Sequence, residues 1–263
     1  MQAKERIKLH KLLKGLGALT LVLVAGASYL GASTVRYMKG VIRDQFNEQQ
    51  LVLAKATAHR IESTIQNAIS DLILLNSLPA IQYCAPDAYE VLLLSTLPLL
   101  NRDKVLEIRR VDRDGNTLLV ANDQGIGMKL FGVVQHEAGA YLSWAADVGN
   151  RGKTMGTVVR PRDPNKDRKQ LVMDLITPTY EDSTDNAHPR PSHRFAGYLR
   201  FTLDVSRLLQ DIMPPIRSGK TGYGWVIDSS GSFLYHPESA FVGENAFEAR
   251  SNRNPGISFA QIN

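Results

Sequence analysis

An uncharged apolar stretch near the N-terminus constrains this chain more than any other feature. Residues Gly15–Val35 contain no charged side chain over 21 positions. A helix rises about 1.5 Å per residue, so the stretch would span roughly 31 Å, which matches a bilayer core of about 30 Å. We therefore expect residues 15–35 to form a transmembrane helix that follows a basic tail at residues 1–14.

The charge pattern around this stretch predicts its orientation. The first 36 residues carry six basic residues and one acidic residue, which accounts for the whole net charge of +5. Basic flanks stay on the cytoplasmic side, so we expect a cytoplasmic N-terminus and export of the residues after about 36. The remainder is neutral overall, and we expect no nucleic-acid partner.

A cleaved signal peptide is the alternative, because Ala25–Ala27 and Gly31–Ser33 are small enough to resemble cleavage sites. We favour an uncleaved anchor, since the apolar run exceeds a usual signal-peptide core and a helical pattern continues beyond it.

Residues 36–78 are expected to form one long helix, a stalk that follows the membrane span. Apolar residues recur at spacings of four, three, four and three, namely Ile61, Ile65, Ala68, Leu72 and Leu75. Pro79 should end the helix, because its ring excludes a helical continuation and forces Leu78 into an extended conformation. The apolar stripe fits packing on the helix's own domain and also fits the seam of a homodimer.

Residues 80–101 are expected to form a shorter helical region, with Asp87 as a possible cap and Val91–Leu94 as its buried side. The pattern then changes to strands. Val105–Val111 and Thr117–Ala121 flank the turn Asp112–Asn116, which predicts a hairpin.

Further strands and one short helix are expected downstream. The expected strands are Met155–Val159, Leu171–Thr177 and Phe195–Leu203, the expected helix is Asp204–Ile212, and the expected polar loops are 160–167 and 181–194. The charged composition of both loops favours exposure to solvent.

A second sheet module follows, and its first recognisable segment is residues 218–224. The strand Trp225–Asp228, the turn Ser229–Gly231 and the strand Ser232–Tyr235 repeat the shape of the first hairpin, in which an Asp and a Gly also shape the turn. We infer an α+β fold built from two similar antiparallel-sheet modules, at residues 79–214 and 215–263.

The anchor, the long helix, the hairpin VDRDGN at 111–116 and the segment SGKTGYGWVIDSSGSFLYHP at 218–237 together resemble the double Cache (dCache) sensor domain of bacterial transmembrane receptors. The resemblance covers about residues 40–263. It implies two PAS-like modules on the extracytoplasmic side of the bacterial inner membrane. It also implies a small ligand in the membrane-distal module and no cofactor. It also implies that the membrane-proximal module is incomplete at Asn263, where a second span and an output domain, first of all a histidine kinase, would follow.

In the distal module, a small anionic or zwitterionic ligand would need a guanidinium for bidentate contact and an aromatic wall that excludes water. The candidate ligand-binding residues are Arg109, Tyr141, Trp144, Arg160, Asp174, Tyr180 and Arg200. Amino-acid-binding members of the family carry an Arg before a Trp-Tyr pair and a late Asp. Here Ala145 follows Trp144, and only Asp204 lies near the late position, so an amino-acid ligand is not predicted.

Catalytic and metal signatures are missing from the sequence. His188 and His193 lie five positions apart in a polar loop, which is not a zinc spacing, and no metal is expected. No serine-hydrolase, zinc-protease or complete phosphate-loop motif occurs. Two other functions stay open: a membrane-anchored periplasmic hydrolase that uses Asp and His residues, and a scaffold module without a sensing role.

Overall fold

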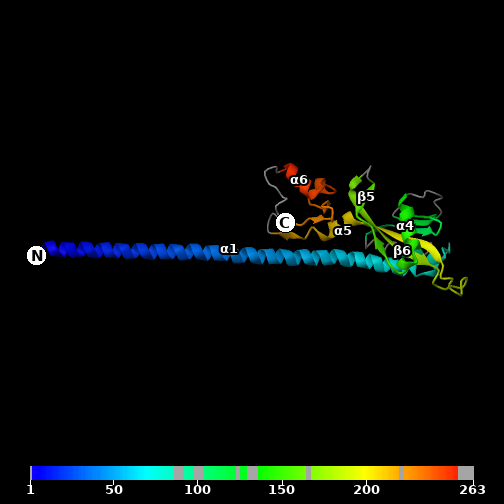
Figure 1. Cartoon of the computed structure of the whole chain (residues 1–263), viewed down its shortest axis with the longest axis horizontal. Helices are drawn as coiled ribbons and strands as arrows, with labels where there is room; N and C mark the ends of the chain where they lie inside the picture. Colours follow the sequence, from blue (N-terminus) through cyan, green and yellow to red (C-terminus); the bar gives the residue numbers. More distant parts are fainter. Residues whose placement is uncertain are drawn as a thin grey trace. The chain divides into compact units, whose positions relative to one another are not determined.

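The computed structural model describes residues 2–85, 92–96, 104–122, 125–128, 136–163, 167–218 and 222–253. The chain divides into two units, Met1–Lys55 and Ala56–Asn263. Helix α1 comprises Gln2–Asn76, so its residues belong to both units (Figure 1). All strands belong to the second unit.

In the first unit, the described side chains of the apolar stretch are exposed, as the 71% exposure of Leu21 illustrates. Among the described residues, α1 is the one helix long and apolar enough to cross a membrane. Its most apolar window of 18 residues has a mean hydropathy of 1.7 and is 0% buried. Length and composition alone carry this finding, and a signal sequence would meet the same criteria.

Helix α1 ends just before the proline that the sequence marks as its stop. Leu78 is extended, with φ −80° and ψ 135°, and Pro79 is the first residue of the short helix α2 (Pro79–Gln82). Proline is favoured at this position because the first helical N–H has no partner within the helix. The expected stripe of α1 is buried at Ala68, Leu72 and Leu75.

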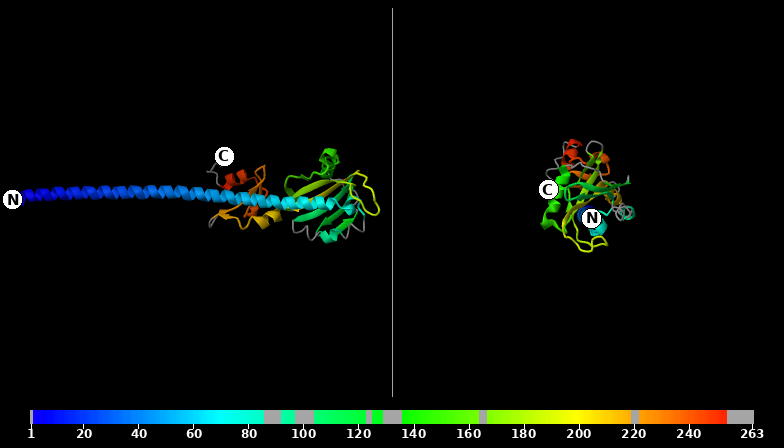
Figure 2. Two further views of the ribbon diagram at one scale, coloured as in Figure 1. Left: turned by 90° about the horizontal axis from the view of Figure 1, so that it is seen from below. Right: turned by 90° about the vertical axis from the view of Figure 1, so that its right-hand side faces the viewer.

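One antiparallel sheet of seven strands follows in the order β3-β2-β1-β7-β6-β4, with β5 paired to β6. Its strands are β1 (Val105–Asp112), β2 (Thr117–Asn122), β3 (Gly125–Met128), β4 (Met155–Gly156), β5 (Arg160–Asp163), β6 (Asp167–Tyr180) and β7 (Phe195–Asp204). Figure 2 shows this sheet in green to yellow; the orange and red elements form no part of it.

The charged segment 160–167 differs from the expectation of a loop. Arg160–Asp163 forms β5, which pairs with the start of β6 through Arg160↔Val172 and Asp163↔Asp167. Two features hid this strand in the sequence: its residues are polar, and Pro161 interrupts the strand pattern. Proline is tolerated there because β5 pairs on one side only, as the strand order shows.

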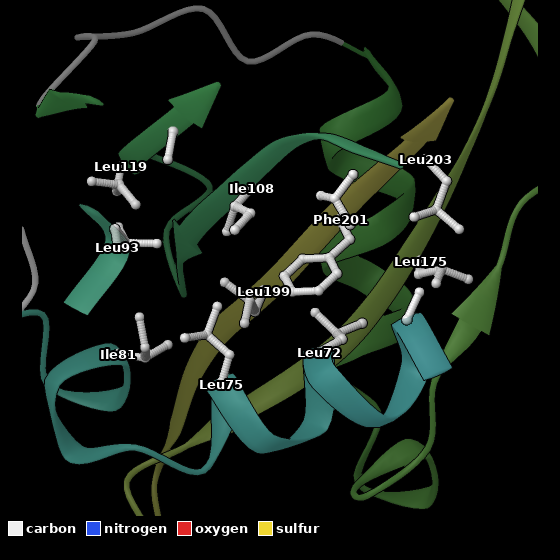
Figure 3. Close-up of a cluster of buried hydrophobic side chains, with 13 residues drawn as sticks. Leu72, Leu75, Ile81, Leu93, Ile108, Leu119, Leu175, Leu199, Phe201 and Leu203 are labelled. Atoms are coloured by element: carbon white, nitrogen blue, oxygen red, sulfur yellow. The ribbon is translucent and has the colours of Figure 1, made fainter. Parts of the chain in front are cut away.

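One face of the sheet packs on the helices. Alternate residues of a strand point to opposite faces, and Leu175, Leu199 and Phe201 all lie on the face that meets α1. Leu72 and Leu75 of α1 point into the same core, which Ile81 of α2 and Leu93 complete (Figure 3). This face is therefore apolar.

A second core begins where β7 ends. Asp204 caps helix α5 (Val205–Ile212) by accepting a hydrogen bond from the Arg207 N–H at 2.9 Å. Leu208, Leu209 and Ile212 pack with Ile61 and with later residues such as Val226 and Leu234.

Val226 and Leu234 belong to two of the small elements that follow α5. These elements are β8 (Arg217–Ser218) paired with β9 (Gly222–Tyr223), β10 (Val226–Ile227) paired with β11 (Phe233–Tyr235), η2 (Ser239–Phe241) and α6 (Ala246–Arg253). Asp87 and Val91 lie outside the described residues, and a module boundary near residue 214 stays a prediction.

The two hairpin turns are built alike, as the sequence repeat predicts. Asp112 Oδ1 accepts hydrogen bonds from the N–H groups of Asp114 and Asn116, at 2.9 and 2.7 Å. Asp228 Oδ1 accepts from Ser230 and Ser232, both at 2.9 Å. The glycines of the two turns have φ values of 85° and 83°, which glycine adopts readily. Each Asp therefore shapes its own turn.

Gly197 allows a close contact between β7 and β1. Its φ is 116°, and an added Cβ would overlap the Val111 carbonyl oxygen and lie 2.8 Å from the guanidinium of Arg110. Arg110 is 1% exposed and donates hydrogen bonds to the carbonyl oxygens of Ile81, at 3.1 Å, and Ala196, at 3.0 Å. Substitution of Gly197 would therefore disturb a buried arginine that joins α2 to two strands.

We expect Gly197→Ala to lower the free energy of unfolding by about 3 kcal/mol or more, because strain at positive φ adds to a backbone clash. Gly152→Ala is the matched control, since Gly152 has φ 76° and open space around its Cβ position. It should cost only about 1–2 kcal/mol. Chemical denaturation measures both, and equal losses would contradict the packing argument.

The loop at 181–194 is held by ion pairs that depend on ionised carboxylates. Burial would raise the pKa of Asp182, but hydrogen bonds from His193 and Arg151 outweigh it and hold the pKa below the usual 3.8. The distances from Asp182 Oδ1 are 2.8 Å to His193 Nδ1 and 2.6 Å to Arg151 Nη2. A lowered pKa stabilises the folded state above the unfolded value, and the gain is lost as pH falls through the folded value.

Asp182→Asn should therefore lower the melting temperature by a few degrees at pH 7, as expected for a half-exposed ion pair worth about 0.5–1 kcal/mol. Once the pH falls below the lowered pKa of the folded state, wild type and variant should melt together, since both side chains are then neutral. A difference that persists undiminished in acid would show that the carboxylate charge is not what holds the loop.

Candidate functional site

The face of the sheet that turns away from α1 carries a cluster of charged and hydroxyl side chains. We call it the arginine cluster, and its members are Glu107, Arg109, Tyr141, Arg160, Asp174, Arg200 and Thr202. Strand alternation explains the placement, because Arg109, Asp174 and Arg200 each occupy the parity opposite to Ile108, Leu175 and Leu199. Tyr141 comes from α4 (His136–Ala146), which packs on β6 and β7.

Asp174 lies at the centre of this cluster and is 0% exposed. Its Oδ1 accepts a hydrogen bond from Thr202 Oγ1 at 2.6 Å. Its Oδ2 accepts from Arg160 Nη2 at 2.8 Å and from the Tyr141 hydroxyl at 3.3 Å. A buried carboxylate requires such donors, because removing its charge from water is costly. One side chain thus joins β5, β6, β7 and α4.

Glu107 forms the second centre of the cluster. Its Oε1 accepts hydrogen bonds from Arg109 Nε at 3.0 Å and from Arg200 Nη2 at 2.6 Å. Arg109 and Arg200 are opposed in register across β1 and β7, so one carboxylate oxygen bridges two neighbouring strands. Side chains of Glu107 and Arg200 are 18% and 11% exposed. The pair is therefore largely removed from solvent.

The hydrogen-bonding capacity of Arg200 is incompletely used by the described residues. Its Nε is buried and has no hydrogen-bond partner among them. Asp174 Oδ1 lies 3.9 Å from this Nε, which is beyond hydrogen-bonding distance. A buried guanidinium N–H without an acceptor is unfavourable, so a rearrangement that supplied an acceptor would be stabilising.

Tyr198 lies beside the cluster. Burial raises the pKa of its phenol, although the positive charges of Arg200 and Arg109 act in the opposite direction. Its ring meets the Tyr141 ring edge to face, with centroids 6.4 Å apart. The two tyrosines thus supply an aromatic border next to the guanidinium groups.

Five of the seven predicted site residues meet in the arginine cluster: Arg109, Tyr141, Arg160, Asp174 and Arg200. Trp144 is not among the hydrogen-bonded members of the cluster and belongs to a neighbouring apolar group with Ile176, Tyr141 and Tyr198. Tyr180 packs on Phe195 and under the guanidinium of Arg151, at 4.6 Å. Both aromatics therefore have structural neighbours of their own.

Sequence reasoning missed Glu107 and Thr202. Each lies two positions from a predicted arginine of the same strand, Arg109 or Arg200, so strand parity could have identified both. Asp204, considered as a late carboxylate, caps α5 and contacts Gln170 instead, at 3.3 Å.

The histidines in the described parts of the chain make other contacts. His188 stacks on Tyr83 with ring centroids 3.8 Å apart and bonds to Asp185. The ring Nδ1 atoms of His188 and His193 bond to Asp185 and Asp182, and that of His236 bonds to the backbone of Glu238. No group of three or more His, Cys, Asp or Glu residues that could hold a metal ion occurs among the residues described here.

Comparison with known proteins supplies the context of this site. The family model dCache_1, described as a Cache domain, matches residues 35–261. No curated protein sequence matches the chain significantly.

Solved structures share the fold at low sequence identity. The extracellular domain of vpHK1S-Z8, described as a histidine kinase, superposes with a TM-score of 0.55 and 14% identity, over 82% of this chain and 78% of that one. The ligand-binding domain of Mlp24 with asparagine gives 0.54 and 16%, over 81% and 78%. The ligand-binding domain of the Pseudomonas fluorescens chemoreceptor CtaA with L-leucine gives 0.50 and 15%, over 81% and 79%.

We expect Asp174→Asn to lower the free energy of unfolding by about 2–4 kcal/mol, because it leaves guanidinium groups near a buried position without their counter-charge. Asp114→Asn is the control, since the Asp114 side chain is 71% exposed, and it should change stability by less than about 0.5 kcal/mol. Urea denaturation compares the two, and a neutral effect at Asp174 would show that the cluster does not depend on this charge.

Proposed function

The chain belongs to the Cache domain family, and we propose that it is the ligand-sensing region of a membrane signal-transduction receptor. The arginine cluster is the observation that carries this proposal. Three guanidinium groups, two carboxylates and a tyrosine hydroxyl converge on one face of the sheet beneath α4. Guanidinium groups recognise carboxylates through paired hydrogen bonds, so the site suits a small anionic or zwitterionic ligand.

The structural neighbours support a small ligand of this kind. Mlp24 and CtaA were solved with asparagine and with leucine, each of which has a carboxylate. In this chain, Arg200 is the proposed docking point for such a group, which would give an acceptor to an Nε that has none among the described residues. Arg109 shares Glu107 with Arg200 and would lie next to the bound ligand.

Signal transfer would start in the strands that carry the cluster. Asp174 and Arg200 face the site, whereas their chain neighbours Leu175 and Leu199 pack against α1. A ligand that changes the positions of β6 and β7 would therefore change their packing on Leu72. Binding would bias an existing equilibrium between two packings, with a coupling of about 1–3 kcal/mol.

The apolar stretch of α1 suits a membrane anchor for this receptor, with the N-terminus in the cytoplasm and the sensor outside the inner membrane. Two Cache modules, at residues 79–214 and 215–263, would then lie on the far side. Exposed apolar residues of α1, including Phe46 and Val52, suit a homodimer through this helix. A histidine kinase is the first candidate for the output domain, and a chemoreceptor or cyclic-dinucleotide enzyme would use the same sensor.

A thermal-shift screen of the whole chain in nanodiscs tests the sensing function. The panel contains small carboxylates and amino acids, and at least one member should raise the melting temperature, because a ligand at about 100 times its Kd stabilises by about 2.7 kcal/mol. Arg200→Gln should abolish the shift. Arg113→Gln should retain it, because the Arg113 side chain is 63% exposed and lies outside the cluster.

Two results would contradict the proposal: no compound of the panel stabilises the wild-type chain, or the shift survives in Arg200→Gln. Circular dichroism of both variants before the screen establishes that each is folded, so that loss of binding can be assigned to the site.

A further inference from the structure

Three of the four carboxylate oxygens in the arginine cluster already accept hydrogen bonds from the protein's own donors. Both oxygens of Asp174 accept hydrogen bonds, from Thr202 on one side and from Arg160 and Tyr141 on the other. Asp174 is also 0% exposed. An ammonium group could reach this carboxylate only by displacing a guanidinium or a hydroxyl that it now holds.

Glu107 is also a poor acceptor for an ammonium group, although its Oε2 has no hydrogen-bond partner among the described residues. Arg109 and Arg200 both donate to its Oε1, at 3.0 and 2.6 Å. Any cation that approached Glu107 would therefore meet two guanidinium groups within a few ångströms, and like charges at such distances repel strongly in a partly buried site.

The charges of the cluster favour an anion. Three guanidinium groups, of Arg109, Arg160 and Arg200, face the two carboxylates of Glu107 and Asp174. The described members of the cluster therefore carry one surplus positive charge. The unpaired, buried Nε of Arg200 adds a donor that needs an acceptor.

We propose that the ligand of this site is a small carboxylate that lacks an ammonium group, and that Arg200 receives its carboxylate. The inference rests on the proposed sensing function and narrows its ligand class. One carboxylate would balance the surplus charge and satisfy Arg200, whereas the ammonium group of an amino acid would find only Glu107 Oε2 open, beside the guanidinium groups of Arg109 and Arg200. Repulsion by like charges is a strong source of specificity.

Matched pairs of acids that differ only in the ammonium group test this inference. The pairs are propionate and alanine, 4-methylpentanoate and leucine, and succinate and aspartate. Isothermal titration with the whole chain in nanodiscs gives the dissociation constant of each, at one pH and ionic strength. We expect at least one acid without an ammonium group to bind at least tenfold more tightly than its amino-acid partner, and Arg200→Gln to remove that binding.

The outcomes separate the ligand class from the sensing function. Tighter binding of an amino acid than of its partner, lost in Arg200→Gln, would overturn the ligand class while the sensing function stands. Binding of none of the six compounds would overturn the inference and count against the sensing function as well. Binding that Arg200→Gln leaves unchanged would overturn the assignment of Arg200, and Arg113→Gln controls for a general loss of charge.

Discussion

The buried carboxylate of Asp174 is the interaction on which the polar side of the sheet depends. A charge without solvent must be matched by donors, and these donors come from three different elements: Arg160 of β5, Thr202 of β7 and Tyr141 of α4. The hydrogen bonds to this one carboxylate therefore hold β5, β7 and α4 in fixed positions around β6. The guanidinium groups that this arrangement gathers are also the groups that a carboxylate ligand would need.

Strand alternation places this charged cluster directly behind an apolar core. Successive residues of β6 and β7 point to opposite faces, so a ligand contact at Arg200 lies one residue from Leu199 and Phe201, which pack with Leu72 and Leu75 of α1. A cluster on an exposed loop would lack this connection. In a close-packed core, small displacements of strands change the packing of neighbouring helices, and this is the physical route that the proposed sensor would use.

Much of the fold follows from local signals in the sequence. Pro79 stops α1, Asp112 and Gly115 shape one hairpin, and Asp204 caps α5; each effect involves residues close together in the chain. Strand parity also brings Arg109, Asp174 and Arg200 to one face. These features could be predicted because strand alternation and helix capping depend only on residues that are close together in the sequence.

Other features depend on distant partners, and the sequence does not contain them in readable form. Strand β5 exists because β6 lies beside it, although Pro161 and the surrounding charges indicate a loop. Trp144 has an aromatic side chain that could line a ligand site, yet the orientation of α4 places this side chain in an apolar group with Ile176. The pairing of Glu107 with both Arg109 and Arg200 likewise depends on the register of β1 and β7.

Hydrogen exchange tests the central claim most directly, namely that the ligand binds on the α4-facing side of the larger sheet. Exchange is measured by mass spectrometry on the whole chain in nanodiscs, with and without the compound that raises its melting temperature. The account predicts slower exchange in β1, β6, β7 and the adjoining residues of α4. Protection confined to residues 222–253, with the larger sheet unchanged, would place the ligand elsewhere and contradict the account.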